Sequence, residues 1–288
     1  MTPDKPWILG LDLGPRCSGA LRFARLLRER LHARVVGTFV SETWQLGPPP
    51  GDGGALALAL RDEAGRWLAG LHAGAADAAV DATRIVDEVD AEAGLASAAR
   101  EAAGVVIGRR LTTPDSWSRL GRVARRLLRR LPAPVIVVPP ELALDDFGGP
   151  ILLATDRGDR SAGAARFAVA LAAGLGRPLI CAHVGEPLWD EYGALAPWRD
   201  ELRATHREAT ERAAREWVAR HCPGAELLVE YGDAVDRLVA LSEHRRPSLL
   251  VVGSGRPQIV ERIFVGSTAS AVAAAAACAV AVVPPDAA

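Results

Sequence analysis

The chain has 288 residues, of which 49% are hydrophobic and 24% are charged, and its formal net charge at neutral pH is −1. This balance is typical of a globular protein and excludes binding to nucleic acid or an anionic membrane through overall charge. The only lysine is Lys5, so the chain lacks the Gly-Lys-Ser or Gly-Lys-Thr sequence that a P-loop nucleotide site requires.

The sequence carries no pattern for secretion or membrane insertion. Its longest uncharged apolar stretch, Ala269–Val283, has 15 residues, which is too short for a helix that spans a bilayer. Residues Met1–Gly10 do not resemble a signal peptide, and none of the four cysteines forms a C-x-x-C pair. We therefore expect a cytoplasmic protein with reduced thiols and no membrane partner.

The first half alternates apolar runs typical of buried strands with segments of helical periodicity. Strands are expected at Ile8–Leu11, Arg34–Val40, Arg84–Val86, Val105–Ile107 and Val135–Val138, and helices at Ser18–Leu31, Leu56–Ala73, Ala91–Glu101 and Ser116–Leu131. Thr43–Gly54 is rich in glycine and proline, which predicts a surface loop. A short linker, residues 141–149, follows the last strand.

The second half repeats this order of elements. Strands are expected at Ile151–Thr155, Pro178–Val184, Glu226–Tyr231, Ser248–Val252 and Ala279–Val283, and helices at Ser161–Ala173, Trp198–Arg220, Asp233–His244 and Ser267–Ala277. Continuous Val, Ile and Leu runs that alternate with helices predict a parallel sheet covered on both faces.

Short sequences recur between the halves at an offset of 144 or 145 residues. Asp12-Leu13-Gly14 returns as Asp156-Arg157-Gly158, Gly19-Ala20 as Gly163-Ala164, and Val138-Pro139-Pro140 as Val283-Pro284-Pro285. A period of this length indicates two whole domains rather than a solenoid. We assign residues 1–140 to the first domain, 150–288 to the second and 141–149 to the linker.

Ligands of open parallel sheets bind beyond the carboxyl ends of the strands, where the strand order reverses. In the second half, Asp156 follows the first strand, Val184 ends the second, and a glycine-containing loop follows the fourth. The residues of this loop that we select are Gly253, Ser254, Gly255, Arg256, Gly266, Ser267 and Thr268. Glycines let backbone N–H groups approach a phosphate, and the helix that starts near Ser267 adds free N–H donors.

These residues resemble the nucleotide-binding pattern of the universal stress protein family, and the whole chain resembles a tandem member. The family pattern is G-x-x-G-x9-G-[ST], with an Asp after strand one and a Val at the end of strand two; members with an intact pattern bind ATP. In the second half the resemblance covers Asp156, Val184, Gly253 and Gly266-Ser267, whereas Arg256 stands at the middle glycine. The resemblance therefore implies a partly retained site for ATP, or for ADP or AMP, with Mg²⁺ as a companion ion.

The first half departs further from that pattern. Asp12, Val40 and Gly108 match, but Leu111 replaces the middle glycine and Arg122 replaces the Ser or Thr. We expect this half not to bind ATP in the family manner.

The expected architecture is α/β: two tandem domains, each an open five-stranded, mainly parallel sheet sandwiched by helices. The resemblance implies a Rossmann-like fold of the adenine-nucleotide α-hydrolase-like type. Family members pair their final strands across a dimer interface. Here Val135–Val138 and Val280–Val283 can pair within one chain as an internal pseudo-dimer, with a homodimer as the further possibility.

Two hypotheses of function follow, from different classes. The first is a stress-response protein that binds an adenine nucleotide in its second half and acts as a switch or sensor, with slow ATP hydrolysis at most. The second is an interaction or scaffold protein whose sites no longer bind nucleotide and whose protein partner is unknown. A true nucleotide-processing enzyme is a third option, but only Asp156 and Asp159 offer acid–base groups near the loop.

Two other features suggest no separate site. The helix Ser116–Leu131 carries six arginines opposite a leucine stripe, and without interleaved aromatic residues it is interpreted as a solvated amphipathic helix rather than a nucleic-acid surface. Cys181 and His183, and likewise His221 and Cys222, lack the spacing of a structural zinc site.

Overall fold

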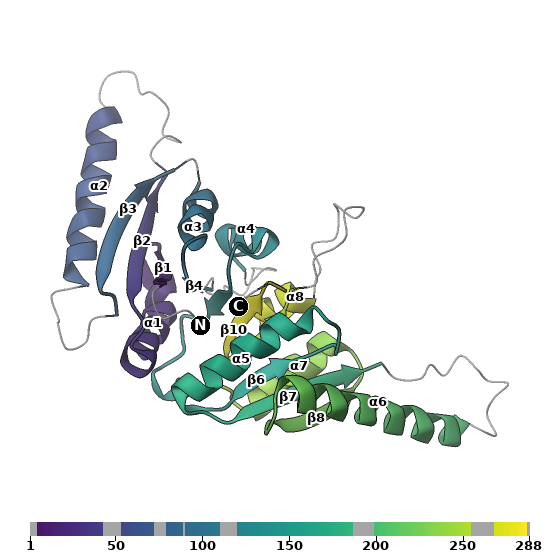
Figure 1. The fold of residues 1–288 in the computed structure, drawn as a ribbon. Helices are drawn as coiled ribbons and strands as arrows, with labels where there is room; N and C mark the ends of the chain where they lie inside the picture. The colour runs from purple at the N-terminus through teal and green to yellow at the C-terminus, as the bar shows by residue number, and fades with distance from the viewer. Residues whose placement is uncertain are drawn as a thin grey trace.

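The computed structural model describes residues 5–42, 53–71, 79–88, 90–109, 120–186, 199–254 and 268–286. Ten strands form a single sheet in the order β3-β2-β1-β4-β5-β10-β9-β6-β7-β8 (Figure 1). The strands are β1 (Trp7–Leu11), β2 (Val35–Ser41), β3 (Ala82–Asp87), β4 (Gly104–Gly108), β5 (Val135–Val138), β6 (Ile151–Ala154), β7 (Leu179–Gly185), β8 (Glu226–Tyr231), β9 (Leu249–Gly253) and β10 (Ala279–Val283).

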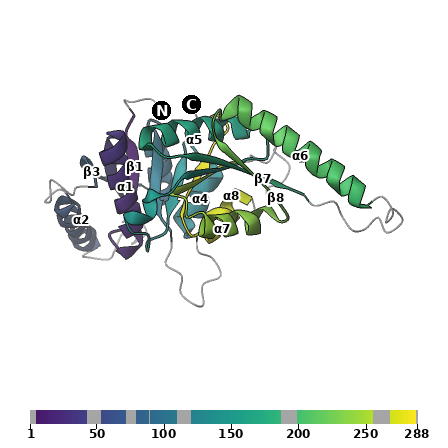
Figure 2. The ribbon, with the colours of Figure 1, turned by 90° about the horizontal axis from the view of Figure 1, so that it is seen from below.

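Helices cover both faces of this sheet. They are α1 (Ser18–Leu31), α2 (Gly53–Gly70), α3 (Ala91–Ala99), α4 (Arg122–Arg130), α5 (Ser161–Leu175), α6 (Arg199–His221), α7 (Ala234–His244) and α8 (Thr268–Ala275), with short 3-10 turns η1 (Pro15–Cys17) and η3 (Asp145–Gly148). Figure 2 shows α5 and α6 on one side of the second half's strands and α7 and α8 on the other. This confirms the α/β architecture expected from the alternating pattern.

Strand residues alternate between two buried hydrophobic cores. Leu9, Val106 and Leu153 belong to the core beneath α1, α5 and α6, whereas Ile8 and Val105 belong to the core beneath α3, α4, α7 and α8. A strand that is buried on both faces needs apolar residues at every position, which explains the continuous runs in the sequence. None of the helices among the described residues is long and apolar enough to cross a membrane.

The two halves join through their last strands. β5 and β10 pair antiparallel, with Val280 opposite Val137 and Val282 opposite Val135, while the other strand pairs of the sheet are parallel. The pairing expected from the sequence is therefore present. It leaves neither of these strands at an exposed edge, and each hydrophobic core continues across the junction.

The repeated Gly-Ala and Val-Pro-Pro sequences contact each other. A Cβ atom at Gly19 in α1 would lie 2.0 Å from the Pro139 carbonyl oxygen, and one at Gly163 in α5 would lie 2.3 Å from the Pro285 carbonyl oxygen. Real Cβ atoms do not approach an oxygen so closely, so only glycine allows the helix to meet the chain that leaves the last strand. The repeated Gly-Ala and Val-Pro-Pro sequences are therefore explained by the same packing of a helix against the end of the last strand in both halves.

One expectation about local structure needs correction. The helix predicted at Ser116–Leu131 begins only at Arg122, because Leu120 is not helical and Gly121 is the extended N-cap residue, with φ −64° and ψ 167°. Within the segment assigned as the linker, η3 places Phe147 in the core, edge-on to Phe23 at 5.2 Å between ring centroids.

Candidate functional site

Each half has a cavity at the carboxyl ends of its strands, where the strand order reverses beside β1 or β6. The first-half cavity has a volume of about 510 Å³ and the second-half cavity about 410 Å³, both within the range of small-molecule sites. Equivalent elements line both: the loop after the first strand, the second strand, the start of α3 or α7, the fourth strand and the start of α4 or α8.

The loop after the first strand has the same turn in both halves. The Asp156 Oδ1 atom accepts hydrogen bonds from the Gly158 amide at 2.8 Å and from the Ser161 hydroxyl at 2.6 Å. Asp12 Oδ1 accepts the Gly14 amide at 3.0 Å in the same way. The residue between the Asp and the Gly has a left-handed backbone conformation in both halves, with φ 66° at Arg157 and 56° at Leu13. The carboxylate thus fixes a turn whose middle residue has the left-handed backbone that residues other than glycine rarely adopt.

The described part of the predicted nucleotide site comes together around the second-half cavity. Asp156, Val184, Gly253, Ser254 and Thr268 all line it. The other four predicted residues, Gly255, Arg256, Gly266 and Ser267, lie outside the described residues, so the phosphate loop remains a prediction.

Ser254 is the best placed polar group on the floor of this cavity. Its amide donates to the Val283 carbonyl at 2.9 Å, which holds the end of β9 against β10. Its hydroxyl oxygen is buried and has no hydrogen-bond partner among the described residues. A buried hydroxyl without a partner is costly, so the described residues leave one hydrogen bond unmade beside this cavity.

Sequence reasoning missed the wall that α7 contributes. Ala234 and Leu238 line the second-half cavity, and Ala91 and Leu95 of α3 line the first-half cavity. Both helices start at a capping aspartate; in α7, Asp233 Oδ1 accepts the Val235 amide at 2.9 Å. The sequence signal for this wall is an Asp directly before an apolar helix, because Asp is a preferred helix N-cap residue. A helix that follows a parallel strand starts at the edge of the sheet where ligands bind, so its first residues can line the site.

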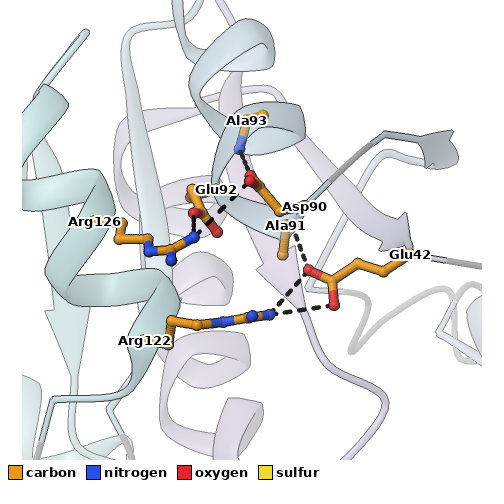
Figure 3. Close-up of polar contacts among 7 residues, drawn as sticks. All are labelled: Glu42, Asp90, Ala91, Glu92, Ala93, Arg122 and Arg126. Carbon is orange, nitrogen blue, oxygen red and sulfur yellow. Dashed lines mark hydrogen bonds and ion pairs between the residues drawn. The ribbon is translucent and has the colours of Figure 1, made fainter. Parts of the chain in front are cut away.

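The first-half cavity differs at its mouth. Arg122 stands at the start of α4, and its Nη2 atom donates to both carboxylate oxygens of Glu42, at 3.2 and 3.3 Å (Figure 3). Glu42 Oε1 also accepts the Ala91 amide at 2.7 Å. Glu42 follows β2, so this ion pair connects the carboxyl end of β2 with the starts of α3 and α4.

A second ion pair joins the same two helices. Arg126 of α4 binds the carboxylate of Glu92, whose side chain is 2% exposed, and also lies near Asp90 (Figure 3). The arginines are solvent-exposed, as the interpretation of an amphipathic helix requires, but Arg122 and Arg126, at 50% and 43% exposure, also pair with acidic residues. Arg125 is exposed as well. The periodicity of the arginines alone could not identify acidic partners that lie far away in the sequence.

The described residues offer little for covalent or metal chemistry. Cys17 lines the first-half cavity, but burial and the nearby Asp12 carboxylate raise the pKa of its thiol to about 11, so it is protonated and weakly nucleophilic at neutral pH. No group of three His, Cys, Asp or Glu side chains in the described ranges lies close enough to hold a metal ion.

Comparisons with known proteins agree with this geometry. The model of the universal stress protein family matches residues 5–139 and 149–284. A universal stress protein from Archaeoglobus fulgidus DSM 4304 is 17% identical with a TM-score of 0.71, over 98% of this chain and 99% of its own. A putative universal stress protein from Pseudomonas aeruginosa UCBPP-PA14 is 18% identical with a TM-score of 0.66, over 99% of this chain and 95% of its own.

A universal stress protein solved in complex with cAMP is 27% identical over 48% of this chain and 98% of its own, with a TM-score of 0.33. Curated proteins yield no match to this chain.

Proposed function

Because the chain belongs to the universal stress protein family along both of its halves, we propose that its second half binds an adenine nucleotide, ATP or ADP or AMP, as a switch in a stress response. The observation that carries the proposal is the second-half cavity. Every described member of the residue set selected from the sequence lines it. One cavity that gathers residues from β6, β7, β9 and α8 is what a ligand site at a sheet's switch point requires.

The residues suggest how such a ligand would lie. The Asp156 carboxylate suits an amino group or a hydroxyl, and Val184 and Leu238 offer apolar contact to a ring. The phosphates would lie toward the start of α8, where free N–H groups and the helix dipole favour negative charge. We expect Mg²⁺ to arrive with the phosphates rather than to occupy a preformed protein site.

The proposed role is binding rather than turnover. The described lining residues include no histidine, and Asp156 is already engaged in its own turn. Without a positioned general base we expect slow hydrolysis at most. We also expect the protein to act in the cytoplasm and to pass its nucleotide state to a protein partner.

The alternative function, a scaffold without nucleotide, is favoured by one observation in the first half. The Arg122–Glu42 ion pair lies where the family pattern expects a Ser or Thr beside phosphate, so one of the two sites has diverged. If the second half has diverged likewise, in the loop outside the described residues, neither half binds ATP.

The first experiment is to denature the purified protein and identify any small molecule released, by chromatography and mass. Added ATP should also raise the melting temperature, because a ligand at 100 times its Kd stabilises by about 2.7 kcal/mol. Ala234→Trp, which fills the second-half cavity, should abolish both effects, whereas its counterpart Ala91→Trp should leave them intact. No released nucleotide and no shift with millimolar ATP would favour the scaffold.

A further inference from the structure

Arg109 belongs to the first half, where it directly follows β4, but its side chain binds the second half. The side chain is buried, at 6% exposure, and its Nη1 atom donates hydrogen bonds to the carbonyls of Ala274 at 3.3 Å and Ala276 at 2.6 Å. Its Nη2 atom donates to a carboxylate oxygen of Glu141 at 3.2 Å. Ala274 lies in the last turn of α8 and Ala276 directly follows this helix. A cation of the first half thus binds the carboxyl end of a helix of the second half.

The sequence of α8 does little to hold this helix in place. The helix has eight residues, and isolated helices shorter than about 12 residues are marginal in water. Its last turn contains no basic residue, so the helix itself supplies no charge to balance the partial negative charge at its carboxyl end. From the second half, the Ser242 hydroxyl oxygen accepts the Ala277 amide at 3.0 Å, a bond that leaves the carbonyls of α8 to Arg109.

The equivalent helix of the first half carries its own positive charge. This helix is α4, and its last turn contains Arg129 and Arg130. Ala274 and Ala275 stand at these two places in α8. The carboxyl end of α4 is therefore balanced by residues of α4, whereas the carboxyl end of α8 depends on a residue from elsewhere.

The position of Arg109 differs between the halves in the complementary direction. Ser254 stands at the same place in the second half, because each residue directly follows the glycine that ends β4 or β9. Their backbones match, since the Arg109 amide donates to the Val138 carbonyl at 2.7 Å and the Ser254 amide donates to the Val283 carbonyl at 2.9 Å. Serine has no charge and is too short to reach the other half. The cation is thus supplied to α8, the helix without basic residues of its own.

The other end of α8 belongs to the candidate site. Its first residues, Thr268 and Ala269, line the second-half cavity. A helix of eight residues is only about 12 Å long, so a contact at one end also fixes the direction of the other. The backbone that carries Arg109 is closely packed, because a Cβ atom at the preceding Gly108 would lie 2.2 Å from the Arg16 carbonyl oxygen. Arg109 therefore connects α8 to a well-packed part of the first half.

We propose that Arg109 is a positioning residue for the second-half site, and that the first half uses it to hold α8 in the orientation that nucleotide binding requires. This inference rests on the proposed binding of nucleotide by the second half and adds its dependence on the first half. Arg109 is not among the described residues that line the second-half cavity, so it acts through α8 and not by touching the ligand. The first half then has a role in binding that needs no ligand of its own.

The test compares Arg109→Met with Arg126→Met in the full chain, each titrated calorimetrically with ATP and Mg²⁺. Arg109→Met removes the cation and keeps an unbranched side chain, so the Kd for ATP should rise at least about fivefold. Arg126→Met is the matched control, because it also removes an arginine of the first half and leaves the buried Glu92 without this partner. The ion pairs of Arg126 lie within the first half, so its loss should change the Kd less than about twofold.

Hydrogen exchange followed by mass spectrometry gives a measurement that needs no ligand. Without ATP, the backbone amides of α8 should exchange at least about tenfold faster in Arg109→Met than in the original protein, and at an unchanged rate in Arg126→Met. Should Arg109→Met fail to fold, Arg109→Gln takes its place in both measurements, because it removes the charge and keeps an amide donor on a shorter side chain.

Equal changes in the Kd for ATP in Arg109→Met and Arg126→Met would overturn the proposal, since a general loss of stability would explain both. An unchanged exchange rate of α8 in Arg109→Met would overturn it as well. If the original protein does not bind ATP, the proposed function fails, while the exchange of α8 still decides whether Arg109 holds this helix. Failure of one proposal is therefore distinguishable from failure of the other.

Discussion

Substituting alanine for the glycine that ends β4 or β9 should have unequal effects in the two halves. A Cβ atom at Gly108 would lie 2.2 Å from the Arg16 carbonyl oxygen and 2.9 Å from its carbon. A Cβ atom at Gly253 would lie 3.7 Å from the Arg160 carbonyl oxygen, an ordinary contact. At Gly108 the obstacle is backbone, so the turn that carries Asp12 must move to make room.

We expect Gly108→Ala to lower the free energy of unfolding by about 1–3 kcal/mol, the usual cost of overpacking a well-packed site. Gly253→Ala should stay within about 0.5 kcal/mol of the original protein, as substitutions without a clash usually do. Urea unfolding followed by circular dichroism measures both, and the melting temperature should fall by about 2–4 °C per kcal/mol. Equal losses for the two variants, or a neutral Gly108→Ala, would refute the reasoning.

Three other predictions concern single side chains. Arg109 is buried and donates hydrogen bonds to the carbonyls of Ala274 at 3.3 Å and Ala276 at 2.6 Å. In urea unfolding, Arg109→Met should therefore lower the free energy of unfolding by about 2–4 kcal/mol. Glu141→Gln should lower it by under about 1 kcal/mol, because the side chain of Glu141 is 62% exposed. Burial lowers the pKa of His183 below its usual 6.5, so the unfolded chain binds the proton more readily than the folded protein does. The free energy of unfolding should therefore fall as the pH drops below about 6.5. His183→Gln should flatten this part of the plot of unfolding free energy against pH. All four cysteines are buried, and the pKa of the Cys17 thiol is about 11, so iodoacetamide at pH 8 should add no mass before denaturant is present; rapid labelling of the native protein would contradict this.

The sequence predicts the sheet well because each strand is buried on both faces. Val135–Val138 and Ala279–Val283 are continuous apolar runs, and their observed bounds are those expected from the pattern. Helix ends are harder to predict, since the leucine and arginine periodicity of α4 continues upstream of Gly121, where the helix starts. The pattern records which face is apolar, but a residue such as Gly121 decides where the helix begins.

Only some features of the candidate site can be predicted from the sequence, for a related reason. Asp156 and Gly253 are recognisable because they follow strands, and strands were predictable. The Arg122–Glu42 contact joins residues 80 positions apart, and nothing local to either residue marks the other as its partner. A comparison of the two halves gives the missing signal, because Arg126 and Glu92 are both replaced by apolar residues at the equivalent positions of the second half.

The two halves differ in a consistent way that bears on function. Residues that set the backbone are repeated: the Asp12 and Asp156 turns, and the glycines of α1 and α5 that meet the chain after β5 and β10. Charged residues beside the cavities are repeated only in part: Glu186 stands at the place of Glu42, whereas Ser267 stands at the place of Arg122. Because the repeated residues shape the backbone around each cavity, the two halves keep one fold although some side chains beside the cavities differ.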